Sequence, residues 1–396
     1  MLALQFIPAF AMLTFHVPQP DSTAASFFAM SSVAVNRHER SAIVCQTPPA
    51  DGGRVLLKIF DSTKTLLSQV IVVNSQFTGV GQNADVVIDD AGIVTVAWEQ
   101  SMDSRILVEV VRFDTGGNQI GKAIMLKDER SLADQVPRIA MGKDGRFTVV
   151  WCALGKGISG QRFSKAGNKL GTIFSVSQQT LSNAQFPSVK MDRQNRIGVV
   201  WQEGSTDDFR IVLRLFDWNL HPSRIVQVDQ SHGQAYFSNP DLLFFKDGNL
   251  VITWKDYRTG EANIFQQKIQ AALKPIGNNI RVNDDTGKQW QRLPRLACTQ
   301  GEEYAVVWED YRNDDNNQIA DVYVQRYTRN GKPLGRNVKV EVTREPTAQR
   351  FPAAAMRRSG DLIITWSDTR WNSSAIYRAE LTPEGREKGV ESQIFP

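Results

Sequence analysis

Arginines that follow a repeated tryptophan are the residues of this chain whose spacing first indicates chemistry. The formula Trp-x-Asp-x-Arg occurs three times and ends in Arg258, Arg312 and Arg370. A guanidinium binds a carboxylate through two parallel hydrogen bonds, so three converging arginines predict a site for an anionic ligand such as a uronate or a sialylated glycan. The alternative, which repetition favours, is structural: each Asp caps a loop, and each Arg pairs with that Asp or with the next repeat.

Aromatic and basic residues also gather in the segments between repeats. These segments contain Tyr236, the run Gln289-Trp290-Gln291-Arg292, and Arg350, while Trp371 follows the last arginine of the formula. Exposed aromatic rings stack on the C–H faces of sugars and arginines bind their acidic groups, which predicts a glycan site. Packing of the rings against adjacent loops is the alternative. The predicted ligand-binding residues are Tyr236, Trp290, Arg292, Arg350, Arg258, Arg312, Arg370 and Trp371.

Residues for acid–base catalysis form no coherent constellation in the sequence. A lyase acting on acidic polysaccharides needs a His or Tyr base beside an arginine, and His232 with Tyr236 is the pair that the loops offer. Two residues of one loop need not point together, so this spacing assigns no role. We therefore name no catalytic residue and expect a protein without enzymatic activity, with a lyase or glycosidase as the alternative.

The sequence predicts no metal site and no cofactor. Its three cysteines and four histidines show no ligand-like spacing, and the cysteines lie in or beside predicted strands as small apolar residues. The acidic loop 310–317, with Asp321 after it, offers oxygen ligands for calcium. This loop lacks the ordered spacing and the glycine of an EF-hand, so a solvated loop is favoured over a calcium site.

The elements that position these residues are set by a repeat. Six tryptophans recur at steps of 53, 50, 53, 54 and 58 residues: Trp98, Trp151, Trp201, Trp254, Trp308 and Trp366. A further step of 53 residues back from Trp98 reaches Cys45, which lies in a similar sequence context. A period near fifty residues with strand-like content is typical of a propeller, in which each unit is one blade. We therefore predict an all-β, seven-bladed propeller of four-stranded antiparallel blades. The tryptophans should fill the gaps between blades.

The predicted chain divides into residues 1–27 and a propeller over 28–396. The blades are expected at roughly 28–80, 81–133, 134–183, 184–236, 237–290, 291–348 and 349–396. Asp-Gly turns and paired glycines four residues apart mark the connections on one face of the ring. The loops after the second strands and between blades share the other, upper face, where their length and diversity predict binding residues. We expect blade seven to close the ring by packing against blade one.

Length, charge and the first residues set further bounds. A net charge of only +4 over 396 residues does not by itself indicate a polyanion-binding protein, and no nucleic-acid motif is visible. Residues 1–19 are apolar enough for a signal-peptide core but lack a positive start and contain Pro8, so a secretion signal and an extra strand are both open. The run is too short and broken to predict a membrane span.

The repeat unit resembles tandem propeller repeats of secreted and cell-surface bacterial proteins. The unit runs Pro-x-(Ile/Leu/Val)-Ala, Asp-Gly, a β-run ending Trp-x-Asp-x-Arg, Asp-Val-Tyr-Val-Gln-Arg-Tyr, and Asn-Gly-x-x-x-Gly. It is similar in layout to sialidase-like and Tol-type propellers. This resemblance implies an extracytoplasmic location (secreted, periplasmic or cell surface) and a binding role toward glycans or proteins. The sialidase Asp box does not occur, so the resemblance fixes no reaction.

Two functions therefore follow from the sequence. The first is a non-catalytic extracytoplasmic propeller that binds a glycan or protein partner through its upper loops. The second is a carbohydrate-active enzyme on acidic sugars. A fold alone does not decide between them, because propellers carry many unrelated functions.

Overall fold

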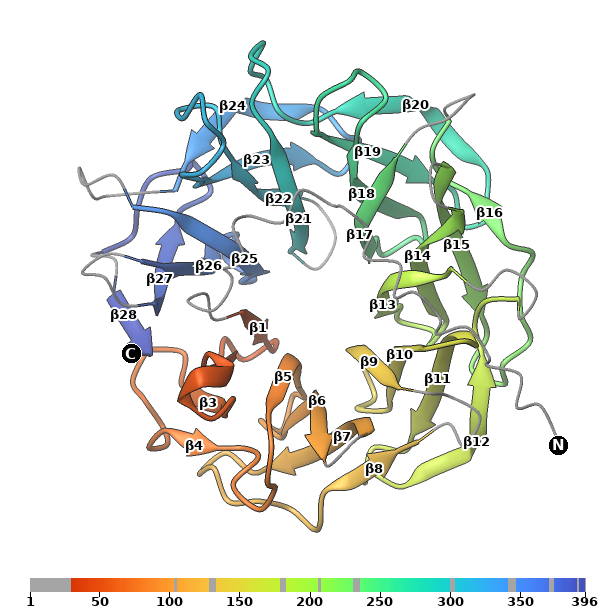
Figure 1. Cartoon of the computed structure of the whole chain (residues 1–396), viewed down its shortest axis with the longest axis vertical. Coiled ribbons are helices and arrows are strands. Elements are labelled where there is room, and N and C mark those ends of the chain that lie inside the picture. Colours follow the sequence, from red (N-terminus) through yellow and green to blue (C-terminus); the bar gives the residue numbers. More distant parts are fainter. Residues whose placement is uncertain are drawn as a thin grey trace, which may run out of the picture.

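The computed structural model describes residues 30–102, 105–127, 133–178, 183–205, 208–230, 236–299, 303–340, 347–369, 374–389 and 392–395. Within them, the strands form seven four-stranded antiparallel sheets, each made of consecutive strands, arranged in a ring (Figure 1). A single turn of 3-10 helix, η1 (Pro49–Asp51), is the one helix among the described residues. The predicted fold class is confirmed. The N-terminal segment 1–27 lies outside the described residues.

The strands follow one another around the ring, four to a blade. Blades one and two contain β1 (Ser31–Val35), β2 (Ser41–Gln46), β3 (Val55–Phe60), β4 (Ile71–Val72), β5 (Gly81–Ile88), β6 (Val94–Met102), β7 (Arg105–Phe113) and β8 (Ile124–Leu126). Blades three and four contain β9 (Asp134–Met141), β10 (Phe147–Ala153), β11 (Gly157–Phe163), β12 (Lys169–Ser175), β13 (Gln185–Met191), β14 (Ile197–Ser205), β15 (Asp208–Phe216) and β16 (Val226–Gln227).

The last three blades follow the same order of strands. They contain β17 (Phe237–Phe244), β18 (Leu250–Asp256), β19 (Asn263–Ile269), β20 (Pro275–Arg281), β21 (Gln291–Cys298), β22 (Glu303–Asp310), β23 (Asp321–Thr328), β24 (Pro333–Lys339), β25 (Gln349–Met356), β26 (Leu362–Asp368), β27 (Ala375–Leu381) and β28 (Ser392–Phe395). In every blade the first strand is innermost and the fourth is at the rim (Figure 1).

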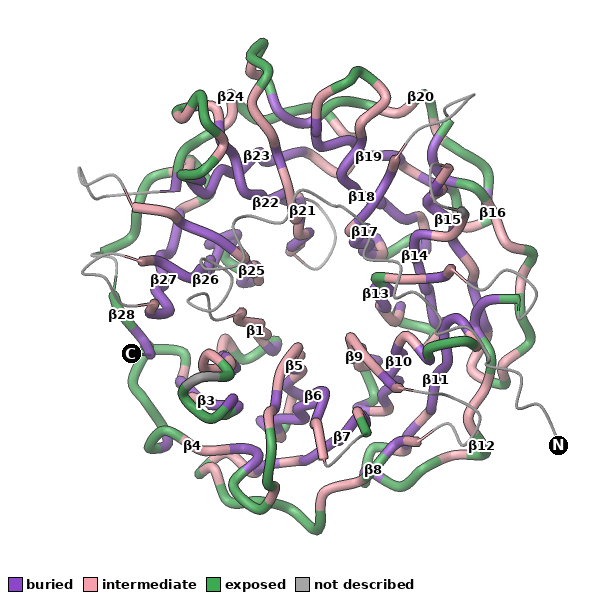
Figure 2. The backbone as a smooth tube through the Cα atoms, viewed as in Figure 1, coloured by how far each residue is buried: buried purple, intermediate pink, exposed green. Residues whose placement is uncertain are grey.

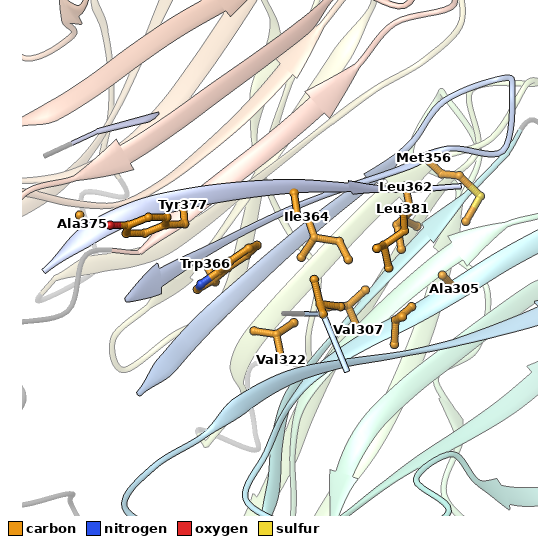
Figure 3. Packing of buried hydrophobic residues seen from close by; sticks show 14 residues of the cluster. Ala305, Val307, Val322, Met356, Leu362, Ile364, Trp366, Ala375, Tyr377 and Leu381 are labelled. Carbon is orange, nitrogen blue, oxygen red and sulfur yellow. The ribbon is translucent and has the colours of Figure 1, made fainter. Parts of the chain in front are cut away.

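The repeated tryptophans fill the spaces between blades, as predicted. All six are fully buried, and each packs against apolar residues of the preceding blade. In Figure 3, Trp366 of blade seven lies with Ile364 above Val307 and Val322 of blade six. Burial runs through the middle of each blade, while the rim is exposed (Figure 2). Because each blade is covered on both faces, its second strand is buried along most of its length and carries apolar residues on both faces rather than alternating.

Blade seven packs directly against blade one, so the ring closes without an exchange of strands. Cys45 occupies the tryptophan slot of blade one and lies in a cluster with Ile363 and Phe395 of blade seven. A hydrogen bond of 2.9 Å joins the hydroxyls of Ser31 and Thr365 across the same junction. The smaller thiol side chain at the Cys45 slot is accommodated because residues from both ends of the chain fill the space around it.

A bulge near the start of the first strand recurs in blades two to seven. There the strand register shifts, and a residue other than glycine takes a positive φ: Asn83, Val136, Phe186, Asn239, Leu293 and Phe351. In blades three to seven a proline follows it. The bulge divides each innermost strand into an upper part at the mouth of the ring and a lower part that lines its centre. Such strained positions persist only where the surrounding structure holds them.

Candidate functional site

The segments that enter each blade and the loops that follow its second strand lie on the same face of the ring. The amide of Tyr257 donates to the carbonyl of Tyr236 at 3.2 Å, and the amide of Tyr311 donates to the carbonyl of Trp290 at 3.0 Å. Each bond joins a residue after the second strand to a residue just before the first strand of the same blade. The predicted upper face is therefore present, at least in blades five and six.

Cross-strand pairs at this face place charged residues around the mouth of the central channel. Above the bulge, Ser238 pairs with Lys255 in blade five, Arg292 with Glu309 in blade six, and Arg350 with Ser367 in blade seven. The equivalent pairs in blades two to four are Gln82 with Glu99, Gln135 with Cys152, and Gln185 with Gln202. Basic side chains thus collect in blades five to seven. We call Tyr236, Lys255, Tyr257, Trp290, Arg292, Glu309, Tyr311 and Arg350 the mouth cluster.

Arg292 stacks on two aromatic rings of the mouth cluster and keeps unused hydrogen-bonding capacity. Its guanidinium carbon lies 4.3 Å from the centre of the Trp290 ring and 5.4 Å from that of Tyr311. Within the part of the chain that the structure describes, its buried Nε has no hydrogen-bond partner. Aromatic stacking fixes the plane of a guanidinium and leaves its in-plane donors directed elsewhere. These donors are suited to a carboxylate or sulfate group.

Lys255 lies beside Arg292 and is buried against two tyrosines. Its Nζ is 5.6 Å from the ring centre of Tyr236 and 5.3 Å from that of Tyr257. Burial, helped by the charge of Arg292 and opposed by Glu309, lowers the pKa of Lys255 to about 7. The amine therefore changes charge near neutral pH. An anion arriving at the mouth would favour its charged form.

Glu309 connects blade six to blade seven at the same mouth. Its carboxylate accepts a 2.6 Å hydrogen bond from the amide of Phe351, the residue at positive φ in blade seven. The hydroxyl of Tyr311 donates to its other oxygen at 3.3 Å. Burial raises the pKa of Glu309, while the Phe351 bond and the charges of Arg350 and Arg292 oppose that rise. Glu309 thus fixes the bulge and supplies one anionic group among three cations.

The structure places Arg258 and Arg312 away from the mouth cluster, in contacts with the outermost strands. Asp256 accepts hydrogen bonds from the indole of Trp254 and from Arg258, whose Nη2 donates to Asn279 of β20 at 3.0 Å. In blade six, Asp310 takes the same bonds from Trp308 and Arg312, whose Nη2 donates to Asn337 of β24. In each blade, the Asp thus binds both the Trp indole and the Arg, and we call this arrangement the staple. It is the structural role that was the alternative to ligand binding. Arg258 is held within its own blade, whereas Arg312 also donates to Asp284, in the segment that links blades five and six, at 2.8 Å. Binding of an anionic ligand by these arginines stays a prediction.

The other predicted ligand residues divide into those that the structure brings together and those that it does not describe. Tyr236, Trp290, Arg292 and Arg350 all belong to the mouth cluster, although Tyr236 and Trp290 are half-buried rather than exposed. Arg350 donates to the carbonyl of Gln318 at 2.7 Å and is 8% exposed. Arg370, Trp371 and His232 lie outside the described residues, so the pair of His232 with Tyr236 stays a prediction.

Lys255, Tyr257, Glu309 and Tyr311 were not predicted. Lys255 and Glu309 immediately follow a repeated tryptophan, in a slot that holds Gln46, Glu99, Cys152, Gln202 and Ser367 in the other blades. A lysine there stands out, and comparing that slot across the repeats would have singled it out. Tyr257 and Tyr311 stand just before the arginine of the Trp-x-Asp-x-Arg formula. Because the formula was interpreted as one repeated unit, the location of these two tyrosines at the mouth was not predicted.

The acidic loop 310–317 uses its oxygen atoms within the protein. Asp314 accepts hydrogen bonds from the amides of Asn316, Gln318 and Ile319, and Asp310 is held by the staple. Among the described residues, no three His, Cys, Asp or Glu side chains come together in a group that could hold a metal ion. The preference for a solvated loop over a calcium site stays a prediction.

Fold and mouth cluster together define a seven-bladed β-propeller with a basic, aromatic edge to its channel. Neither a family model nor a curated protein matches the chain. Among solved structures, the chain is similar to a polysaccharide lyase of family PL25, an ulvan lyase, with a TM-score of 0.59, 10% identity, and coverage of 92% of this chain and 97% of that one. At this identity the similarity concerns the fold.

Two further solved propellers show similar agreement. Polysaccharide lyase Uly1 matches with a TM-score of 0.55, 10% identity, and coverage of 87% of this chain and 88% of that one. A protein of unknown function from Dyadobacter fermentans DSM 18053 matches with a TM-score of 0.54, 10% identity, and coverage of 79% and 94%. In the residues placed by the structure, no helix has the length and apolar character needed to cross a membrane.

Proposed function

We propose that this propeller binds an acidic glycan at the mouth of its channel, without cleaving it. The observation that carries the proposal is Arg292, which is stacked on Trp290 at 4.3 Å and has a buried Nε without a partner among the described residues. A guanidinium held flat by an aromatic ring binds the carboxylate of a uronate, or a sulfate ester, through parallel hydrogen bonds. Lys255 and Arg350 add positive charge beside it, and Trp290 offers a ring face for a sugar.

The test is calorimetric titration of the purified protein with polymers that differ only in charge. We expect binding to a glucuronate-containing or sulfated polysaccharide and none to a neutral one. Arg292→Gln should weaken that binding at least about tenfold, because a charge-assisted hydrogen bond contributes about 1.5 to 3 kcal/mol. Arg336→Gln, which removes an exposed arginine of β24, is the matched control and should bind like the wild type. Equal binding by both variants would contradict the proposal, and binding to no glycan would indicate a protein partner instead.

A second candidate function is cleavage of the same polymer by β-elimination. Lys255 favours it, because an amine with a pKa near 7 beside Tyr236 and Tyr257 is a candidate general base. Solved propellers of similar fold include lyases, one of them bound to a glucuronate–sulfated rhamnose disaccharide unit. The base would remove the proton next to the uronate carboxylate, and Arg292 would neutralise the charge that develops. The electron pair would then form a carbon–carbon double bond as the bond from the next carbon to the glycosidic oxygen breaks, and the hydroxyl of Tyr236 or Tyr257 would give a proton to that departing oxygen. Incubation with the polymer and ultraviolet detection of an unsaturated product would reveal this activity.

We also propose an extracytoplasmic location, on the basis of the repeat type and a ligand that occurs outside cells. A C-terminally tagged full chain expressed in bacteria and separated into cytoplasmic, periplasmic and medium fractions tests it. Recovery only from the cytoplasm would contradict this location.

A further inference from the structure

The lower parts of the innermost strands line a central cavity of about 560 Å³. One position in each of these strands, two residues after the positive-φ residue in blades two to seven, points to the same cavity. Around the ring it is occupied by Ser32, Asp85, Arg138, Ser188, Asp241, Arg295 and Ala353. Blades one to three and blades four to six therefore repeat the triplet Ser, Asp, Arg, and blade seven breaks it.

Serine and aspartate of each triplet have an evident structural role. Asp85 accepts hydrogen bonds from the Ser32 hydroxyl of the preceding blade at 2.6 Å and from the Ile139 amide of the following blade at 3.0 Å. Asp241 does the same with the Ser188 hydroxyl at 2.7 Å and the Leu296 amide at 2.8 Å. Each aspartate also accepts a bond from the amide of the residue after it. The bonds of Asp85 thereby join blades one to three, and those of Asp241 join blades four to six.

The arginines that complete the triplets are not explained by this lock. Arg138 donates to the carbonyl of Pro137 at 2.8 Å, and Arg295 donates to that of Pro294 at 3.1 Å. Among the ion pairs of the described residues, neither guanidinium has a carboxylate partner within 4 Å. Blades three and six lie across the ring from one another (Figure 1), so the two side chains face a shared space. Burial and the charge of Arg138 lower the pKa of Arg295, opposed by Asp241, Asp85 and Glu309.

We propose that the channel binds a small oxyanion, such as sulfate, phosphate or a carboxylate, between Arg138 and Arg295. The charged residues lining the cavity are these two arginines, Lys190, Asp85 and Asp241. Three cations thus face two carboxylates. Each aspartate already accepts three hydrogen bonds, whereas each arginine uses one donor on a proline carbonyl. Like charges held in a low-dielectric cavity repel one another, and an anion between them removes that cost. Guanidinium groups approaching from two sides suit an anion with several oxygens.

The site is tested on the wild-type protein and on two double variants. Crystals soaked in bromide should show an anomalous peak between Arg138 and Arg295, and the absence of a peak there would overturn the proposal. In solution, sulfate added at constant ionic strength should raise the Tm of the wild type along a saturable curve. In Arg138→Gln/Arg295→Gln the apparent affinity for sulfate should fall at least about tenfold, the loss expected from one charge-assisted hydrogen bond.

The matched control is Arg224→Gln/Arg336→Gln, which removes two exposed arginines and should keep the wild-type curve. An identical sulfate dependence in both double variants would mean that sulfate acts on the whole surface, and it would refute the channel site. If the channel variant fails to fold, the bromide experiment on the wild type decides. Crystals of Arg292→Gln soaked in bromide should keep the anomalous peak between Arg138 and Arg295, so this proposal and the glycan proposal fail separately.

Discussion

The indole Nε1 of Trp308 donates a 2.7 Å hydrogen bond to Oδ2 of Asp310, two residues along the same strand. Both side chains are fully buried, and Arg312 donates to the same carboxylate at 2.7 Å. Asp310 therefore satisfies the buried N–H of Trp308, whose ring fills the space between blades. The same carboxylate also orients the loop that follows the strand. This arrangement recurs at Trp254 with Asp256, and Trp366 donates to Asp368 at 3.3 Å.

Removing the aspartate of this staple should destabilise the fold. In Asp310→Ala, the Trp308 indole and the Arg312 guanidinium both lose a buried partner, and the pKa of Arg312, which Asp310 and Asp284 raise, should fall. We expect the free energy of unfolding to decrease by about 3 kcal/mol, as for a buried ion pair that loses one member. Urea denaturation measures it. Asp90→Ala, which breaks a partly exposed ion pair with Arg37, is the control and should cost less than about 1 kcal/mol.

Glu109 should make stability depend on pH. It is 1% exposed, and burial, opposed by Lys169, raises its pKa from 4.5 to about 7. Between these values the folded protein binds more protons than the unfolded chain, so stability should decrease as pH rises through this window. Glu109→Gln cannot ionise, and it should gain about 2 to 3 kcal/mol on the wild type between pH 5 and pH 8. Thermal unfolding at both pH values measures the gain, and a difference independent of pH would contradict the assignment.

Lys255 should give glycan binding a pH dependence. Its pKa of about 7 means that the ammonium form, which attracts an anion, is lost as pH rises through neutrality. Affinity for the acidic polymer should therefore fall between pH 6 and pH 8, by about tenfold at low ionic strength if the charge contributes about 1.4 kcal/mol. Lys255→Met should bind equally at both pH values and no more tightly than the wild type at pH 8. A wild-type affinity that does not change with pH would exclude this role for the lysine.

Ring closure should depend on the apolar junction between the first and last blades. Ile363 is fully buried in the cluster that contains Cys45 and Val33 of blade one. Ile363→Ala should lower the free energy of unfolding by about 2 to 5 kcal/mol, as expected for a large-to-small change in a core. Val338→Ala on the exposed face of β24 should change it by less than about 0.5 kcal/mol. Similar effects of the two substitutions in chemical denaturation would argue against a closed ring.

The repeat made the architecture predictable from the sequence, because each copy must bury the same faces against its neighbours. Trp98 through Trp366 therefore identified the blades and the spaces that they fill, and Cys45 identified the blade without a tryptophan. The staple was also foreseeable at Asp256 and Asp310, since a feature repeated from blade to blade serves the common framework.

The candidate site was only partly predictable, because a repeat does not say which strand or edge a side chain reaches. Arg258 and Arg292 looked equivalent as arginines of the upper loops, but the first reaches the outer strand β20 and the second lies on the inner strand β21. Lys255 resembled any other strand residue until the neighbouring blade placed Arg292 beside it and burial changed its pKa. The closed ring decided these differences, because contacts between blades arise only when strands distant in sequence are brought around a common axis.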